Sequence, residues 1–596
     1  MLGPHDLHAE HPALAREARL NAPIARAAPG LAALLRYRRE DLPHDLAAGL
    51  AVAAVAIPSS IAAAQLAGLP PVVGLYGCLL PQVAYALFGT SPQLMLGPSA
   101  VGAAIVASGV APLAVGVPER YADYAMALTL VTGLICIAAS WLRLGGLMDF
   151  FSKPILVGFL NGVAIDVMSR QGSRLFGIAV EGDGILSRAW AFLNKLPQAH
   201  WPTLAVGLGT IAVLVVAPRL VRRVPATLIA IVVAALAVRI IALAPLGVAT
   251  LESVAGGLPA LRWPALPLDK LTLLVGEAAG IALVIFTMTM AAARSFADRN
   301  RYDIDADREI VALGVANVAA ALSQSFAVNG ATSRTAAGEV AGARTQMTGI
   351  VAAVAIALVL LFFSGLLAAI PRVALSAVLV VAAFALFDWR TMVAIRRIDQ
   401  REFWIGMTAT VGVVAVGVIN GILVAVVLAL VSFLRLVSRP QVECLGAIPG
   451  QPGFHAIARH PEAVVPEGLV LLRFDGPVVF FSAPFFKREV QKAALDAGPG
   501  LRWFVIDLMP VNMVDATGLY AMREAIDELR ARGVVVGAAT REAQWAEWAE
   551  TRGLAGELER VRFFPSLRQA VKAYRREVML MAESDAGDEL PEEAAP

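Results

Sequence analysis

The sequence predicts an α-helical polytopic membrane protein with about fourteen transmembrane segments and a small cytosolic α/β domain at its C-terminal end. Of the 596 residues, 58% are hydrophobic and 16% are charged, and the mean hydropathy is +0.69. Apolar stretches near bilayer-spanning length follow one another from about residue 46 to residue 438. After Pro440, short apolar strands alternate with helical patterns. This composition excludes an ordinary soluble protein and extensive disorder.

The first 45 residues are polar and lack the compact apolar stretch of a signal peptide, which predicts a cytosolic N-terminal segment. The transmembrane domain is expected over residues 46–438. Its spans are placed near 47–64, 71–88, 98–112, 122–142, 153–170, 203–218, 225–245, 272–293, 308–324, 332–343, 346–366, 372–387, 403–419 and 421–437.

Charged residues predict the orientation and exclude several functions. The connections expected on the cytosolic side hold most of the Lys and Arg, which places both termini in the cytosol. The formal net charge of +2, from 49 basic and 47 acidic residues, gives no indication of a nucleic-acid partner. Three cysteines and seven histidines without metal-ligand spacing predict neither a metal nor a cofactor. Without a nucleotide loop or a catalytic triad, we expect no enzyme and no primary pump.

Two of the predicted spans are short and interrupted by Pro, Gly and small polar residues. One begins at Leu96-Gly-Pro-Ser-Ala100 and the other at Asn329-Gly-Ala-Thr-Ser-Arg-Thr335. They are the third and tenth spans, equivalent places in two halves of seven, which is the pattern of a transport site between inverted repeats. Two converging helix N-termini supply about one unit of positive charge, and Arg334 adds another. An anion site is therefore expected, although Gly and Pro also occur in spans as simple kinks.

Several motifs resemble those of the sulfate permease family (SulP, the solute carrier 26 family). The similarity covers about residues 40 to 575. The motifs are Ala56-Ile-Pro-Ser-Ser60, Leu66-Ala-Gly-Leu-Pro-Pro71, Gly74-Leu-Tyr76, Tyr85-Ala-Leu-Phe-Gly-Thr-Ser91, Lys153-Pro-Ile-Leu-Val-Gly-Phe159, Ala293-Arg-Ser-Phe-Ala297, Ser333-Arg-Thr335, Ala341-Gly-Ala-Arg-Thr-Gln346 and Leu386-Phe-Asp388.

The resemblance implies a seven-plus-seven inverted repeat divided into core and gate domains, followed by a cytosolic STAS domain. It also implies transport of an anion such as sulfate, bicarbonate, chloride or a dicarboxylate, by a homodimer in the cytoplasmic membrane, through an elevator-like movement of the core. Carried over position by position, the substrate-binding residues would be Ser59, Ser60, Ser99, Ala100, Thr287, Met288, Thr332, Ser333 and Arg334.

Two positions depart from the family pattern. Met288 stands where bacterial relatives frequently have a carboxylate, which argues against proton symport through this residue. Ser59 stands where relatives often have a glutamine, which weakens the dicarboxylate alternative. The choice among anions, and between exchange and uniport, stays open at this point.

The region 439–580 resembles a STAS domain, and residues 581–596 are expected to be an acidic disordered tail. Within the loop Val514-Asp-Ala-Thr-Gly-Leu519, Thr517 matches the serine that is phosphorylated in anti-sigma-factor antagonists. Thr517 is therefore a candidate regulatory phosphorylation site, and the alternative, which we favour, is that it caps the following helix. The domain also suggests a cytosolic protein partner and a second class of function, a membrane-bound anion sensor.

Overall fold

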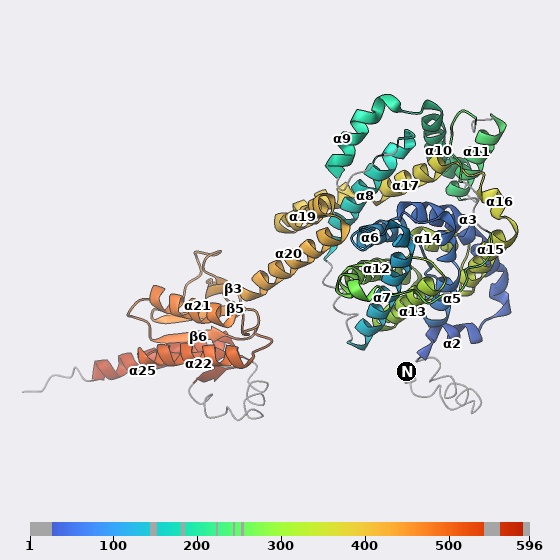
Figure 1. Ribbon diagram of the computed structural model, residues 1–596. Coiled ribbons are helices and arrows are strands. Elements are labelled where there is room, and N and C mark those ends of the chain that lie inside the picture. Colours follow the sequence, from blue (N-terminus) through green and yellow to red (C-terminus); the bar gives the residue numbers. More distant parts are fainter. Residues whose placement is uncertain are drawn as a thin grey trace, which may run out of the picture. The chain divides into compact units, whose positions relative to one another are not determined.

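The computed structural model describes residues 27–142, 152–178, 180, 185–221, 225–241, 245–251, 256–540 and 561–587 (Figure 1). The chain divides into two compact units, residues 1–429 and 430–596. The sequence also predicts a helix over 541–551. That range, the first 26 residues and the end of the tail, 588–596, lie outside the described residues.

The first half of the membrane unit is helical, with one two-residue strand before the third predicted span. The second predicted span is two helices, because Gly77 ends one and Pro81 opens the next. The elements are α2 (Pro29–Leu35), α3 (Leu42–Leu66), α4 (Pro71–Tyr76), α5 (Leu80–Phe88), β1 (Leu96–Gly97), α6 (Ala100–Val110), α7 (Tyr121–Trp141), α8 (Lys153–Leu175), α9 (Ile185–Lys195), α10 (Trp201–Leu220) and α11 (Ala226–Ile240).

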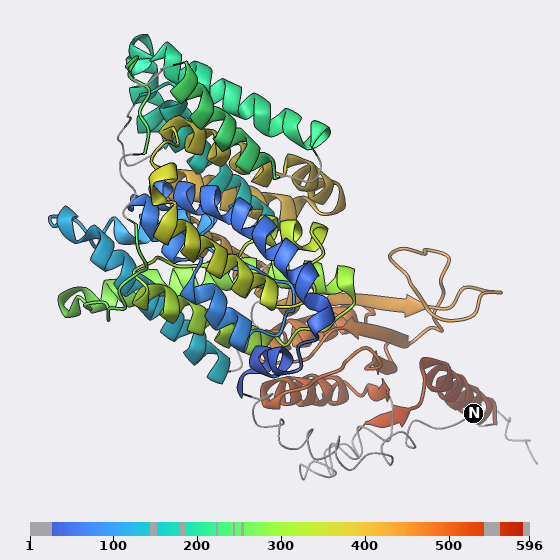
Figure 2. The ribbon, with the colours of Figure 1, turned by 90° about the vertical axis from the view of Figure 1, so that its right-hand side faces the viewer.

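The second half repeats this order, again with a two-residue strand before the interrupted span. Figure 2 shows α3 and α15, which come from different halves, packed side by side. The elements are α12 (Leu271–Asn300), α13 (Ala306–Leu322), β2 (Asn329–Gly330), α14 (Thr332–Val340), α15 (Met347–Phe362), α16 (Ser364–Leu367), α17 (Arg372–Leu386), α18 (Trp389–Ile398), α19 (Gln400–Val416) and α20 (Val418–Ser438).

The predicted fold class is confirmed, a helical membrane unit followed by an α/β unit. In the described ranges, six helical stretches have the length and apolar composition needed to cross a bilayer, and three shorter apolar helices accompany them. Helices α9 and α18 of this unit were not expected, because their polar residues lower the hydropathy averaged over a window of span length.

The second unit contains a six-stranded sheet of order β4-β3-β5-β6-β7-β8. The strands β5 (Leu469–Asp475), β6 (Trp503–Asp507), β7 (Val535–Ala539) and β8 (Arg562–Phe564) are parallel, whereas β3 (Gln441–Gly446) and β4 (His455–Ala456) pair antiparallel. Helices α21 (Ala483–Asp496) and α22 (Ala516–Ala531) share one apolar core with the sheet, and α25 (Leu567–Gly587) shares a second. Alternate residues of β5 and β6 enter each core, so helices cover both faces.

The sequence predicts strands at Val470–Phe474, Trp503–Asp507 and Val534–Ala538, and the structure confirms all three within one residue at each end. The tail is different from the expectation, because α25 continues to Gly587 and so includes the first seven residues of the segment predicted to be disordered. The Ala, Glu and Met residues there favour helix when a packed helix already precedes them.

Candidate functional site

The two interrupted spans meet at a short antiparallel pair. Leu96 pairs with Gly330 and Gly97 with Asn329. Helix α6 begins at Ala100 and α14 begins at Thr332, so neither helix runs through the interruption. Because the paired segments are antiparallel, the two helices leave the pair in opposite directions and both present their N-termini to it. The first residues of each helix carry backbone N–H groups without helical acceptors.

Arg334 is buried behind these helix tips, with an exposed fraction of 2%. Its Nη2 atom donates to the Pro98 carbonyl oxygen at 2.6 Å, to Ser60 Oγ at 2.8 Å and to Ser59 Oγ at 3.3 Å. The guanidinium therefore links the tenth span to the first span and to the residue before the Ser99 cap. A Cβ atom on Gly97 would lie 1.8 Å from Nη1 of Arg334, so any larger residue there would displace the guanidinium.

The hydroxyl groups at the two tips are engaged differently. Ser99 Oγ donates to Asn329 Oδ1 at 2.6 Å and accepts from the Gly102 N–H at 3.0 Å, so its only donated hydrogen is used within the protein. Thr332 and Ser333 are exposed in the first turn of α14. The α14 tip can therefore offer hydroxyl donors to a ligand, whereas the α6 tip, at Ala100, offers backbone N–H groups.

The structure places the remaining predicted residues on the two helices beside the tips. Ser59 and Ser60 of α3 contact Arg334, as described above. Met288 of α12 is half-buried, and Thr287 is buried and donates to the Leu283 carbonyl at 2.7 Å. The tips, α3 and α12 are linked by hydrogen bonds, because Thr289 Oγ1 of α12 accepts from the Gly330 N–H at 2.9 Å.

Several buried polar residues hold the interruption in place, and the sequence interpretation missed them. Gln82 Oε1 accepts from the Leu96 N–H at 2.7 Å, and Asn317 Oδ1 accepts from the Val328 N–H at 2.9 Å. Thr335 Oγ1 accepts from the Met95 N–H at 3.0 Å. The available signal was a lone amide or hydroxyl side chain in an otherwise apolar helix, which needs a buried partner.

Two buried carboxylates of this unit, Asp45 and Glu309, form hydrogen bonds with segments other than the helix tips. Asp45 accepts from the N–H groups of Arg344 and Thr345, and Glu309 accepts from the N–H groups of Thr90 and Ser91. Both side chains are fully buried. The family resemblance would place a carboxylate at position 288, but this chain has Met288 there. The positive field of the helix tips therefore has no negative group at that position.

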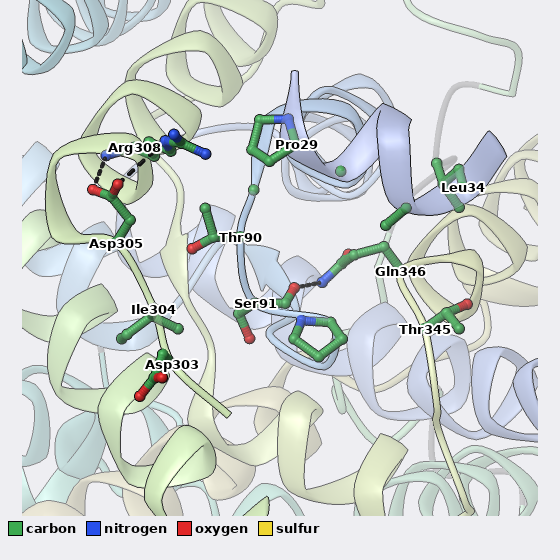
Figure 3. Close-up of a pocket in the computed structure, with 14 residues that line it drawn as sticks. Pro29, Leu34, Thr90, Ser91, Asp303, Ile304, Asp305, Arg308, Thr345 and Gln346 are labelled. Atoms are coloured by element: carbon green, nitrogen blue, oxygen red, sulfur yellow. Dashed lines mark hydrogen bonds and ion pairs between the residues drawn. The ribbon is translucent and has the colours of Figure 1, made fainter. Parts of the chain in front are cut away.

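A cavity of about 450 Å³ lies away from the helix tips (Figure 3). It is lined by α2, by the chain segments 89–92 and 303–308, and by Thr345 and Gln346. Gln346 Nε2 donates to the Ser91 carbonyl at 2.7 Å across its wall. None of the nine predicted substrate-binding residues lines it, so this cavity is not the candidate site.

In the α/β unit, Asp515 rather than Thr517 caps α22. Asp515 Oδ1 accepts from the Gly518 N–H at 2.7 Å and its Oδ2 accepts from the Phe480 N–H at 2.8 Å. The favoured alternative, a capping role for Thr517, is therefore wrong, because Thr517 is already inside the first turn and is exposed. Its exposure leaves the hydroxyl accessible, and phosphorylation stays a prediction.

A helical unit with two interrupted helices paired tip to tip, followed by an α/β unit, defines a polytopic membrane protein of the carrier class. The comparisons agree. Residues 42–409 match the sulfate permease family and residues 460–570 match the STAS domain. The chain belongs to the sulfate permease family, and the expected resemblance is confirmed.

Curated relatives agree with this assignment, and solved structures share the fold. A probable sulfate transporter of Mycobacterium tuberculosis is 36% identical over 550 residues, covering 92% of this chain and 98% of that protein. Sulfate transporter 1.1 of Arabidopsis thaliana is 29% identical and covers 83% and 80%. The murine Slc26a9 anion transporter in the inward-facing state shares the fold with a TM-score of 0.84 at 20% identity, covering 96% of each chain. The transmembrane domain of the cyanobacterium bicarbonate transporter BicA gives 0.59 at 22% identity, covering 66% and 98%.

Proposed function

We propose that this protein is a secondary transporter that moves a small inorganic anion across the cytoplasmic membrane, and that the α6 and α14 tips bind the anion. The observation that carries the proposal is the antiparallel pairing of Leu96–Gly97 with Asn329–Gly330, which brings both helix N-termini to the same paired segment. Each N-terminus contributes about half a positive charge, and Arg334 contributes a full one from behind. An unpaired anion in a low-dielectric interior needs such a field to offset its desolvation.

The hydrogen-bond donors at the two helix tips suit an anion that accepts several hydrogen bonds. Backbone N–H groups at Ala100 and the exposed hydroxyls of Thr332 and Ser333 would contact it, while Arg334 acts through its charge rather than as a direct ligand. We favour sulfate, since the relatives from M. tuberculosis and A. thaliana are named sulfate transporters. Bicarbonate and chloride remain within the same chemistry.

The hydrogen-bond network supports an elevator-like mechanism. Hydrogen bonds of Arg334 join α14 to α3 and to the α6 tip. A hydrogen bond from the Gly330 N–H to Thr289 joins the paired segment to α12. These four helices would therefore move as one body that carries the anion. Helices α8, α10, α17 and α19 pack mainly on one another, with smaller contacts to α3 and α6, and would form the gate. We expect both termini in the cytosol and a homodimer.

The test is uptake of radiolabelled sulfate, bicarbonate and chloride into proteoliposomes that hold the full chain. The Thr332→Val/Ser333→Ala variant removes two exposed hydroxyls without disturbing Arg334. Because a hydrogen bond to a charged group is worth roughly 1.5–3 kcal/mol, the half-saturating concentration should rise at least about tenfold. Thr408→Val, on α19, is the matched control and should behave like the wild type. Uptake of none of the three anions by folded protein would refute the proposal.

Two alternatives make different predictions. A dicarboxylate transporter would take up succinate in the same assay and prefer it to sulfate. A membrane-bound anion sensor would bind anions without flux and would signal through the STAS domain to a cytosolic partner. Deleting the residues after Pro440 separates the classes, since a folded carrier retains some flux. A pH gradient should change uptake little, because Met288 cannot take up a proton.

A further inference from the structure

Helix α18, Trp389–Ile398, is a short amphipathic helix between the apolar helices α17 and α19. It begins after Asp388, whose Oδ1 accepts from the Thr391 N–H at 2.9 Å. Its buried side, Met392 and Ile395, packs with Val157 of α8 and Phe403 of α19. The helix is thus fixed at one end of the membrane spans and does not cross the bilayer itself.

The opposite side of α18 and the start of α19 expose arginine and tryptophan together. Trp389 is 48% exposed and Trp404 is 59% exposed. We call this surface the α18 patch, and its members are Trp389, Arg390, Arg396, Arg397, Arg401 and Trp404. Ile398, beside the patch, is 85% exposed, so apolar surface borders the charges.

The arginines of the patch are not paired with the neighbouring carboxylates that the structure describes. Among the described residues, none of its four arginines makes an ion pair. Asp388 and Asp399 lie close by, but their carboxylates accept backbone N–H groups at the starts of α18 and α19. Arg396 lies over the Phe403 ring at 5.5 Å, which orients the guanidinium and leaves its charge uncompensated.

We propose that the α18 patch binds the headgroup of an anionic phospholipid. Guanidinium groups bind phosphate in bidentate geometry, and tryptophan side chains favour the headgroup level of a bilayer. Arginines next to membrane spans attract anionic lipid, and the adjoining apolar surface at Ile398 suits acyl chains rather than a soluble phosphate. By the predicted orientation the patch faces the cytosolic leaflet. This inference does not depend on which anion the protein transports.

The test uses the full chain in nanodiscs of phosphatidylcholine and phosphatidylglycerol at 3:1, with a trace of photoactivatable phosphatidylglycerol. Mass spectrometry after illumination measures labelling of residues 387–404. The Arg390→Gln/Arg396→Gln/Arg397→Gln variant should lose labelling by at least about tenfold, since each charge near an anionic surface is worth roughly fivefold. Half-molar salt should weaken the wild-type labelling through screening. The matched control, Arg120→Gln/Arg239→Gln/Arg262→Gln, changes exposed arginines elsewhere and should stay within about twofold.

Three results would overturn the proposal. One is equal labelling by photoactivatable phosphatidylcholine, and another is undiminished labelling of the triple variant. The third is chemical cross-linking of residues 387–404 to residues 430–587 or to a second copy, because protein would then cover the patch. Should the triple variant fail to fold, the wild type still decides the question: unlabelled phosphatidylglycerol should compete with the label, and competition by glycerol phosphate alone would favour a soluble ligand instead.

Discussion

Replacing Arg334 tests whether its charge acts on the anion from a distance. Nη2 lies 2.6 Å from the Pro98 carbonyl oxygen, two residues before the Ala100 N–H that would contact the anion. An anion there would lie roughly 7 Å from the guanidinium, judged from about 3.8 Å between consecutive Cα atoms. At an effective dielectric constant of about 20, one negative charge at that distance gains about 2.4 kcal/mol, or roughly 50-fold in affinity.

Arg334→Ala should therefore weaken chloride binding about 50-fold and sulfate binding by the square of that factor, because sulfate carries two charges. The ratio of sulfate to chloride affinity should fall about 50-fold. This ratio is the best quantity to measure, by equilibrium binding in detergent, because it does not depend on how much of the protein is folded. The substitution also leaves the Pro98 carbonyl and Ser60 without their donor, so lower stability is expected.

Arg334→Lys separates charge from direct coordination. Lysine retains the positive charge but presents one nitrogen instead of a planar fork. If the charge acts at a distance, the affinity ratio should stay within about fivefold of the wild type. A ratio that does not change in Arg334→Ala would refute the electrostatic reasoning, and a lysine variant as defective as the alanine variant would show that Arg334 binds the anion directly.

Three further predictions test the surroundings of the site and the α/β unit. Gly97→Ala should lower sulfate uptake, because the added Cβ would lie 1.8 Å from Nη1 of Arg334 and would displace the guanidinium. Thr289→Val should leave the Gly330 N–H without its acceptor and cost about 1–3 kcal/mol, seen as a lower Tm that Thr289→Ser restores. Asp515→Ala should destabilise the α/β unit by about 1–2 kcal/mol in thermal unfolding, whereas Thr517→Val should change it by under about 0.5 kcal/mol; equal effects would contradict the assigned cap.

The places where the chain breaks could be predicted from local chemistry. Gly97, Pro98 and Gly330 interrupt apolar stretches, and the structure starts α6 and α14 within three residues of them. The side chains that hold these interruptions in place could not be predicted. Gln82 and Asn317 are recognisable only in the folded chain, where they accept hydrogen bonds from the backbone N–H groups of Leu96 and Val328. Such contacts join residues 11 to 14 positions apart with no periodic signal.

Sequence alone determined the helical membrane class and the α/β unit, and it predicted the positive sign of the proposed site, because hydrophobicity, chain-breaking residues and helix dipoles are local properties. Only the tertiary structure decided what Arg334 does. Its guanidinium is turned inward to Ser60 and the Pro98 carbonyl, while Thr332 and Ser333 keep their side chains exposed. Side-chain direction at the start of a helix depends on the packing of neighbouring helices, and that packing cannot be predicted from a single sequence.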